Sequence, residues 1–179
     1  ILFCWISAAV IALITLRKGV GNGAQLLLWA LLPSGVLLYA VGDSGPLALI
    51  VGTTALAMVL RTTVSLSLSV LTGIAVGALS GLALVAFGGP YLEQMVTLFG
   101  DFLANLEQQL SQGGDAVQLP RPTAVQIAGM LGAGTGTMSI LCLLLARYWQ
   151  AALYNPGGFG SEFRLLRYTP AVATAMALA

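Results

Sequence analysis

Few side chains in this sequence could take part in chemistry. The chain has 179 residues and no histidine, which excludes Ser-His-Asp and Cys-His catalytic groups and histidine-ligated metal sites. Cys4 and Cys142 both lie inside apolar runs, where a thiol packs as a small hydrophobic group. Intramembrane hydrolysis would need a paired nucleophile and base, and the sequence shows neither. We therefore predict that the protein is not an enzyme and holds no cofactor or metal.

Uncharged polar side chains are the remaining candidates for a binding site. No Asp, Glu or Lys lies in the middle of an apolar segment, which argues against a pump that powers its own transport. Hydroxyls in helices commonly bond to their own backbone, but the amide of Gln126 needs other partners. We predict that Gln126, Thr135 and Thr137 line a polar cavity.

The elements that would position these residues follow from composition. Charged residues make up 7% of the chain and apolar residues 58%. A soluble enzyme needs a charged surface, which so few charged residues cannot supply. A nucleic-acid-binding protein needs a basic surface, and a net charge of +1 argues against one. The composition predicts an all-α, polytopic transmembrane bundle whose surroundings are the lipid bilayer.

About 20 apolar helical residues are needed to cross a bilayer. Five to six apolar segments meet this requirement, some of them only in part. We expect one transmembrane domain over 1–179. A turn is required near 61–65, because a single helix over 46–87 would be about twice the membrane thickness. The first and last segments are short, so we expect the chain to be truncated at both ends. The expected spans are 1–16, 24–41, 46–64, 66–87, 123–149 and 170–179.

The few charges predict which side of the membrane each loop occupies. With alternating spans, six of the seven bases fall on one side and five of the six acids on the other. Lys and Arg mark cytoplasmic loops. We therefore expect the basic side to be the cytoplasm, residue 1 to lie outside, and the membrane to be the inner membrane of a bacterium.

An amphipathic helix is predicted over 90–110, in the loop on the acidic side. Apolar residues from Leu92 to Leu110 recur at helical spacing, and acidic and amide side chains occupy the opposite face. Three interpretations remain open. The helix could lie on the outer leaflet, form a lid over the bundle, or dock a partner.

Small residues spaced four apart predict close helix packing, because they let two backbones approach in lipid. The same ridges could pack within the bundle or dock against another membrane subunit. The residues concerned are Ala8, Ala12, Gly73, Gly77, Gly81, Gly132 and Gly136.

The segment after the fifth span predicts a cytoplasmic loop. A helix should continue to about Tyr154 and stop at Asn155-Pro156, glycines should then allow a reversal, and a short interfacial helix should precede Pro170. The loop could be an ordinary membrane anchor or a docking surface. Its candidate residues are Arg147, Trp149, Tyr154, Asn155, Pro156, Gly157, Gly158, Arg164 and Arg167.

Residues 146–164, which read Ala-Arg-Tyr-Trp-Gln-Ala-Ala-Leu-Tyr-Asn-Pro-Gly-Gly-Phe-Gly-Ser-Glu-Phe-Arg, follow the amphipathic segment and resemble the YybS-like family of bacterial membrane proteins of unknown function. Arg17-Lys18-Gly19 and Leu60-Arg61-Thr62-Thr63-Val64-Ser65 are similar to that family too. The resemblance implies a further span before residue 1 and others after Ala179. The family is distantly similar to the substrate-binding S components of energy-coupling factor transporters, which implies docking through small residues such as Ala8 and Ala12.

Two functions are therefore expected, with no nucleic-acid partner for either. The first is a small-solute-binding transport subunit of the S-component kind, whose ligand the sequence leaves unknown. The second is a structural or assembly subunit of a larger inner-membrane complex. Both have another membrane subunit as partner.

Overall fold

A computed structural model describes residues 3–111, 118–154 and 158–164, and within these ranges every regular element is a helix. The all-helical prediction is confirmed over this part of the chain. Four helices, α2, α3, α4 and α6, are long and apolar enough to cross a membrane. The described elements are α1 (Cys4–Lys18), α2 (Val20–Val41), α3 (Gly45–Thr63), α4 (Leu66–Phe87), α5 (Gly89–Ser111), α6 (Ala124–Tyr154) and α7 (Gly158–Arg164).

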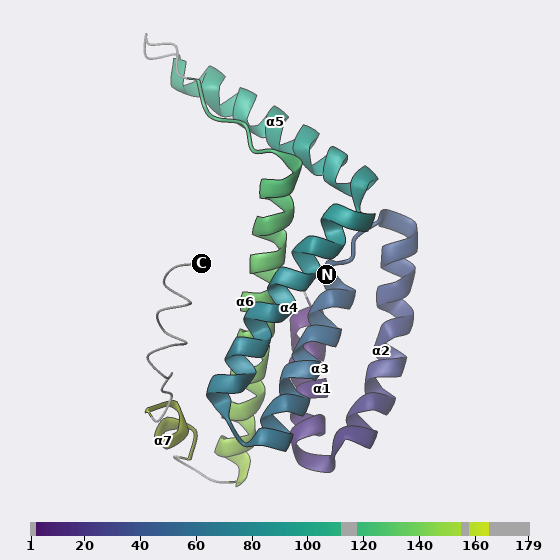
Figure 1. Cartoon of the computed structure of the whole chain (residues 1–179), viewed down its shortest axis with the longest axis vertical. Helices are drawn as coiled ribbons and strands as arrows, with labels where there is room; N and C mark the ends of the chain where they lie inside the picture. Colours follow the sequence, from purple (N-terminus) through teal and green to yellow (C-terminus); the bar gives the residue numbers. More distant parts are fainter. Residues whose placement is uncertain (1–2, 112–117, 155–157, 165–179) are drawn as a thin grey trace.

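The helices form an up-and-down bundle in which α1, α3, α4 and α6 pack around one another (Figure 1). The pair α4 and α6 shares the most extensive interface, and α2 packs on the outside against α1 and α3. α5 leaves the end of α4, runs obliquely past the start of α6 and rises away from the bundle, while α7 lies at the opposite end (Figure 1).

The first expected span is present as a shorter helix. α1 has 15 residues and rises about 22 Å, less than the roughly 30 Å of a bilayer core. Residues 170–179, the sixth expected span, lie outside the described residues. Four candidate spans are therefore shown, and the expected number of five to six is not.

The loop expected at 17–23 is reduced to one residue. Gly19 adopts φ 105°, a conformation open mainly to glycine, so α1 can end and α2 can begin without a longer connection. Gly23 then packs directly against Thr15, where a larger side chain would clash with the Thr15 hydroxyl. The expected start of the second span at residue 24 was thus late by one helical turn.

The turn required near 61–65 is present. α3 ends at Thr63 and is followed by its C-cap residue Val64, which has φ 52° and whose backbone N–H donates to Leu60 O. Ser65 then caps α4, because its hydroxyl accepts a hydrogen bond from the backbone N–H of Leu68 at 3.3 Å. Val64 and Ser65 thus separate α3 from α4, which the apolar sequence pattern alone would join into one continuous helix.

α6 ends at Tyr154, as expected. The following short helix is α7, which begins at Gly158 and so includes two of the glycines expected to form the reversal. Residues 155–157, which include Asn155, Pro156 and Gly157, lie outside the described residues, as does Arg167.

Candidate functional site

The glycine ridges of α4 and α6 lie against each other. A Cβ atom added at Gly132 would be 2.5 Å from the backbone oxygen of Gly77, and one added at Gly136 would be 2.7 Å from the backbone oxygen of Gly73. A Cβ atom on Gly81 would meet the backbone oxygen of Ala128 at 3.1 Å. The two backbones are therefore in direct contact over at least two turns, which only glycine allows.

The small residues of α1 face the inside of the same bundle. Ala12 is fully buried in a cluster with Leu56 of α3 and Leu143 of α6. Ala8 is fully buried in a second cluster, beside Ile50 and Cys142. In this arrangement α3 and α6 cover both alanines, so neither presents a surface on which another subunit could dock.

The three residues expected to line a polar cavity are not brought together. Gln126 closes the start of α6, where its Oε1 accepts from the backbone N–H of Thr123 at 2.9 Å and the Thr123 hydroxyl accepts from the backbone N–H of Gln126 at 3.3 Å. This reciprocal arrangement is a capping box. The Thr135 hydroxyl donates to Leu131 O, one turn back in its own helix. The Thr-x-x-Gln spacing was the sequence signal for the capping box.

Four of the other buried hydroxyls in the described bundle are also bonded to the preceding turn of their own helix, whereas the buried hydroxyl of Thr53 is not. The donors are Thr15, Thr54, Ser69 and Ser139, with oxygen–oxygen distances of 2.8 to 3.0 Å. Such bonds leave the hydroxyl little capacity to bind a solute.

Thr137 lies instead in an apolar groove between α4 and α6, with a volume of about 570 Å³. Ile74, Ala78 and Leu82 of α4 form one wall. Gly129 and Ala133 of α6 line the other, and the contacting glycines make the floor. The groove was not predicted. The only sign of it in the sequence is that Gly129 and Ala133 add a second row of small residues to α6.

Two of the bases at one end of the bundle contact a neighbouring helix. We call this end, which carries Arg17, Lys18, Arg61, Arg147 and Arg164, the basic end. Arg61 Nη1 donates to Thr15 O at 3.1 Å and to Leu16 O, which satisfies the last carbonyls of α1. The Arg17 guanidinium lies 3.2 Å from the ring centroid of Tyr154, a cation–π contact.

The remaining predicted loop residues have structural contacts at this end. Arg147 Nη1 donates to Gln150 Oε1 at 2.7 Å. Trp149 packs on the cluster around Ala8. α7 lies against α6 through an edge-to-face contact between Phe159 and Tyr148, with ring centroids 6.1 Å apart. Gly158 and Arg164 are the first and last residues of α7.

The opposite, acidic end carries α5. Leu92 is buried against Leu84 and Ile127, so the first turns of α5 are fixed to α4 and α6. Tyr91 packs on Gly42 in the α2–α3 turn. Burial, and to a lesser extent the Asp43 carboxylate, raises the pKa of Tyr91 above its ordinary value.

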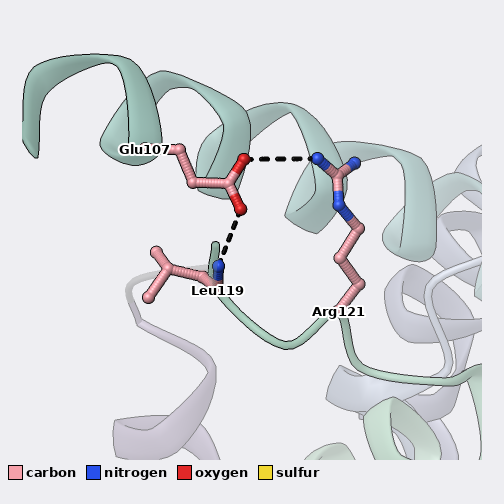
Figure 2. Close-up of polar contacts among 3 residues, drawn as sticks. All are labelled: Glu107, Leu119 and Arg121. Carbon is pink, nitrogen blue, oxygen red and sulfur yellow. Dashed lines mark hydrogen bonds and ion pairs between the residues drawn. The ribbon is translucent and has the colours of Figure 1, made fainter. Parts of the chain in front are cut away.

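Beyond its first turns α5 is supported by the chain returning from it. Glu107 accepts a hydrogen bond from the backbone N–H of Leu119 at 2.8 Å and forms an ion pair with Arg121 at 3.5 Å (Figure 2). Several apolar side chains of the same helix are nonetheless exposed, Phe102 by 58%. The helix and residues 118–123 together form what we call the α5 arm. Its exposed apolar residues are Leu98, Phe99, Phe102 and Leu110.

Comparison with known proteins found no matching family model, no similar curated protein and no similar solved structure.

Proposed function

We propose that this protein is a non-enzymatic, multi-pass subunit of a larger assembly in a bacterial inner membrane. The observation that carries the proposal is the α5 arm. It is anchored at Leu92 and braced by Glu107, yet Phe99 and Phe102 are exposed beyond the bundle. An exposed apolar surface rimmed by polar groups is typical of a site of protein or membrane interaction.

A partner subunit is favoured over the lipid surface for two reasons. The polar face of the arm carries Glu93, Asp101 and Glu107, whereas helices that bind anionic lipid have basic polar faces. The ion pair of Glu107 with Arg121 also orders the arm before binding, which lowers the entropic cost of association. Only the first turns of α5 lie across the end of the bundle, and the rest of the helix rises away from it, which does not favour the interpretation as a lid (Figure 1).

The orientation that we propose places the acidic end outside and the basic end in the cytoplasm. It is supported by the positions of the bases at the ends of α1, α3 and α6, opposite the acidic α5 arm.

Native purification of the full-length protein tests this proposal. A stoichiometric protein partner should co-purify in mild detergent, and the Phe99→Ser/Phe102→Ser variant should lose it. The control Asn105→Ser/Gln108→Ser changes the exposed polar face of the same helix and should retain the partner. Purification of the wild-type protein alone, or retention of the partner by the Phe99→Ser/Phe102→Ser variant, would contradict the proposal.

Binding of a small solute, as an S component would do, is the alternative that the sequence suggests. The separation of Gln126, Thr135 and Thr137 does not support it within the described bundle. A thermal-shift screen of vitamins against the full-length protein tests this alternative. A vitamin that stabilises the protein, together with a co-purifying ATPase, would favour transport over a structural role.

A further inference from the structure

Three bases gather where α1 ends, α2 begins and α3 ends, at the basic end of the bundle (Figure 1). They are Arg17 and Lys18 of α1 and Arg61 of α3, and we call them the Arg61 cluster. Arg61 Nη1 donates to Thr15 O at 3.1 Å, and Arg61 Nη2 would lie 3.7 Å from a Cβ atom added at Gly19. Arg61 thus reaches from α3 to residues on either side of Arg17 and Lys18.

The positive charge of the Arg61 cluster is not neutralised within the part of the chain that the structure describes. The Arg61 guanidinium donates to uncharged carbonyl oxygens, and the Arg17 guanidinium lies on the ring of Tyr154. None of the three bases has a carboxylate partner among the described residues, and the first turn of α2 contains no acidic residue. Because neutral partners hold the two guanidinium groups without cancelling their charge, the exposed cluster is preorganised to bind an anion.

Exposed apolar side chains lie directly beside the cluster. Val20 is the first residue of α2 and Val64 follows the last residue of α3, and their side chains are 38% and 85% exposed. Both helices are candidate spans, so we expect their ends here to lie at the level of the lipid headgroups. An anion that carries long apolar chains would contact these valines, whereas a soluble anion would gain nothing from them.

We propose that the Arg61 cluster binds the phosphate group of one anionic phospholipid, whose acyl chains lie along α2 and α3. Both described hydrogen bonds of Arg61 use Nη1, so Nη2, on the side of Gly19, can donate to the phosphate. Lys18 and Arg17 add positive charge on the same side. Arginine pairs well with phosphate oxygens, and basic residues at the cytoplasmic ends of spans commonly bind anionic headgroups. The inference goes beyond the proposed function, because it concerns the basic end and not the α5 arm.

Gly21 offers a variant that changes the charge beside the cluster without removing a base. It is exposed, lies two residues from Gly19, and a Cβ atom there would meet nothing within 4 Å. Gly21→Asp should fold, since an acidic residue favours the first turn of a helix, but its carboxylate should repel a phosphate. Gly21→Asn is the uncharged control of the same size. Asn105→Asp makes the same change in net charge on the α5 arm.

Native mass spectrometry of the delipidated full-length protein in a neutral detergent tests the proposal. Phosphatidylglycerol is the anionic probe, and phosphatidylcholine is the zwitterionic comparison. The wild-type protein should bind phosphatidylglycerol more tightly, in a one-to-one complex. Gly21→Asp and Lys18→Gln should each lower this affinity about fivefold, the usual effect of one charge near a headgroup. Gly21→Asn and Asn105→Asp should leave it unchanged. The melting temperature of each variant without added lipid shows whether it is folded.

Several results would overturn the proposal. Equal affinities of the wild-type protein for the two lipids would show that the headgroup charge is not recognised. Unchanged affinity in folded Gly21→Asp and Lys18→Gln would place the lipid elsewhere. An equal loss of affinity in Asn105→Asp would indicate a response to net charge alone. Displacement of phosphatidylglycerol by an equal concentration of inorganic phosphate would assign the cluster to a soluble anion.

Discussion

Gly132 and Gly134 stand two residues apart on α6 and have opposite surroundings. A Cβ atom at Gly132 would meet the backbone of α4, whereas one at Gly134 would meet nothing within 4 Å. Backbone cannot move aside as a side chain can, so an added methyl group must separate the two helices. The two glycines therefore provide a matched pair for testing the α4–α6 interface.

We expect Gly132→Ala to destabilise the protein by about 1–3 kcal/mol, the usual cost of overpacking. Gly134→Ala should be neutral or stabilising, because alanine favours a helix over glycine by roughly 0.5–1 kcal/mol. Thermal unfolding of both variants in the same detergent measures the difference. Equal stabilities would show that α4 and α6 are further apart than described.

Arg61 provides a second residue-scale prediction. Its guanidinium satisfies the final carbonyls of α1 and lies beside Gly19. Arg61→Gln should lower the melting temperature by a few degrees, and Arg61→Lys should recover only part of the loss, since lysine cannot donate from a planar fork. A neutral Arg61→Gln variant would show that the capping bonds contribute nothing in the bilayer.

Tyr91 predicts a dependence on alkaline pH. Its pKa is raised in the fold, so its contribution to stability is complete below the unfolded pKa of about 10 and is lost as the pH rises through the folded pKa. The absorbance titration of the wild-type protein minus that of Tyr91→Phe should show a midpoint above 10. Asp43→Asn should lower this midpoint only in part, because burial is the larger cause. A midpoint at or below 10 would contradict the described packing.

At the scale of elements, the sequence predicted helices better than it predicted their ends. The apolar runs over 46–64 and 66–87 differ from α3 and α4 by at most one residue at either end. The start of α2 was missed because the conformation of one glycine, Gly19, removes a whole loop. Gln126 was wrongly predicted to line a cavity. Its side chain bonds instead to the nearby backbone N–H of Thr123, and a list of polar residues does not reveal such a local partner.

The position of α5 can be tested with a disulfide. A Cβ atom at Gly42 would lie 3.8 Å from Cβ of Tyr91, within the range that a disulfide requires. Gly42→Cys/Tyr91→Cys should therefore cross-link on mild oxidation, although φ 74° at Gly42 is strained for cysteine. Mass spectrometry detects the disulfide as a loss of two hydrogens. Gly42→Cys/Glu93→Cys is the matched control, since residue 93 lies far around the helix from residue 91. Equal cross-linking of both pairs would indicate that α5 is not held at the α2–α3 turn.

At the scale of the whole molecule, the sorting of charges was readable from the sequence, but the packing of helices was not. Spacing showed that Gly73, Gly77 and Gly81 form a ridge, yet it did not show which helix would meet that ridge. Likewise Ala8 and Ala12 could equally have faced a partner, and only the three-dimensional arrangement places them inside. Periodicity identifies the face of a helix, whereas the contact depends on two faces at once.

The proposed orientation predicts the labelling of engineered cysteines in a bacterial host. Asn105→Cys, on the α5 arm, should react with a membrane-impermeant maleimide in cells whose inner membrane is intact. Lys18→Cys, at the basic end, should react only after that membrane is permeabilised. The reverse pattern would place the basic end outside and contradict the positive-inside assignment.

The contact between the glycine ridges also constrains how the protein is made. Gly73 and Gly132 are separated by about 60 residues, including the whole α5 arm. At a synthesis rate of roughly 5–20 residues per second, α4 waits about 3–12 s before its partner surface on α6 has been translated. During that interval the glycine ridge of α4 must contact lipid, α3 or the insertion machinery. The most extensive helix interface of the described bundle can thus form only after α6 has been made, and a ribosome paused within the α5 arm would leave the ridge without its partner for longer.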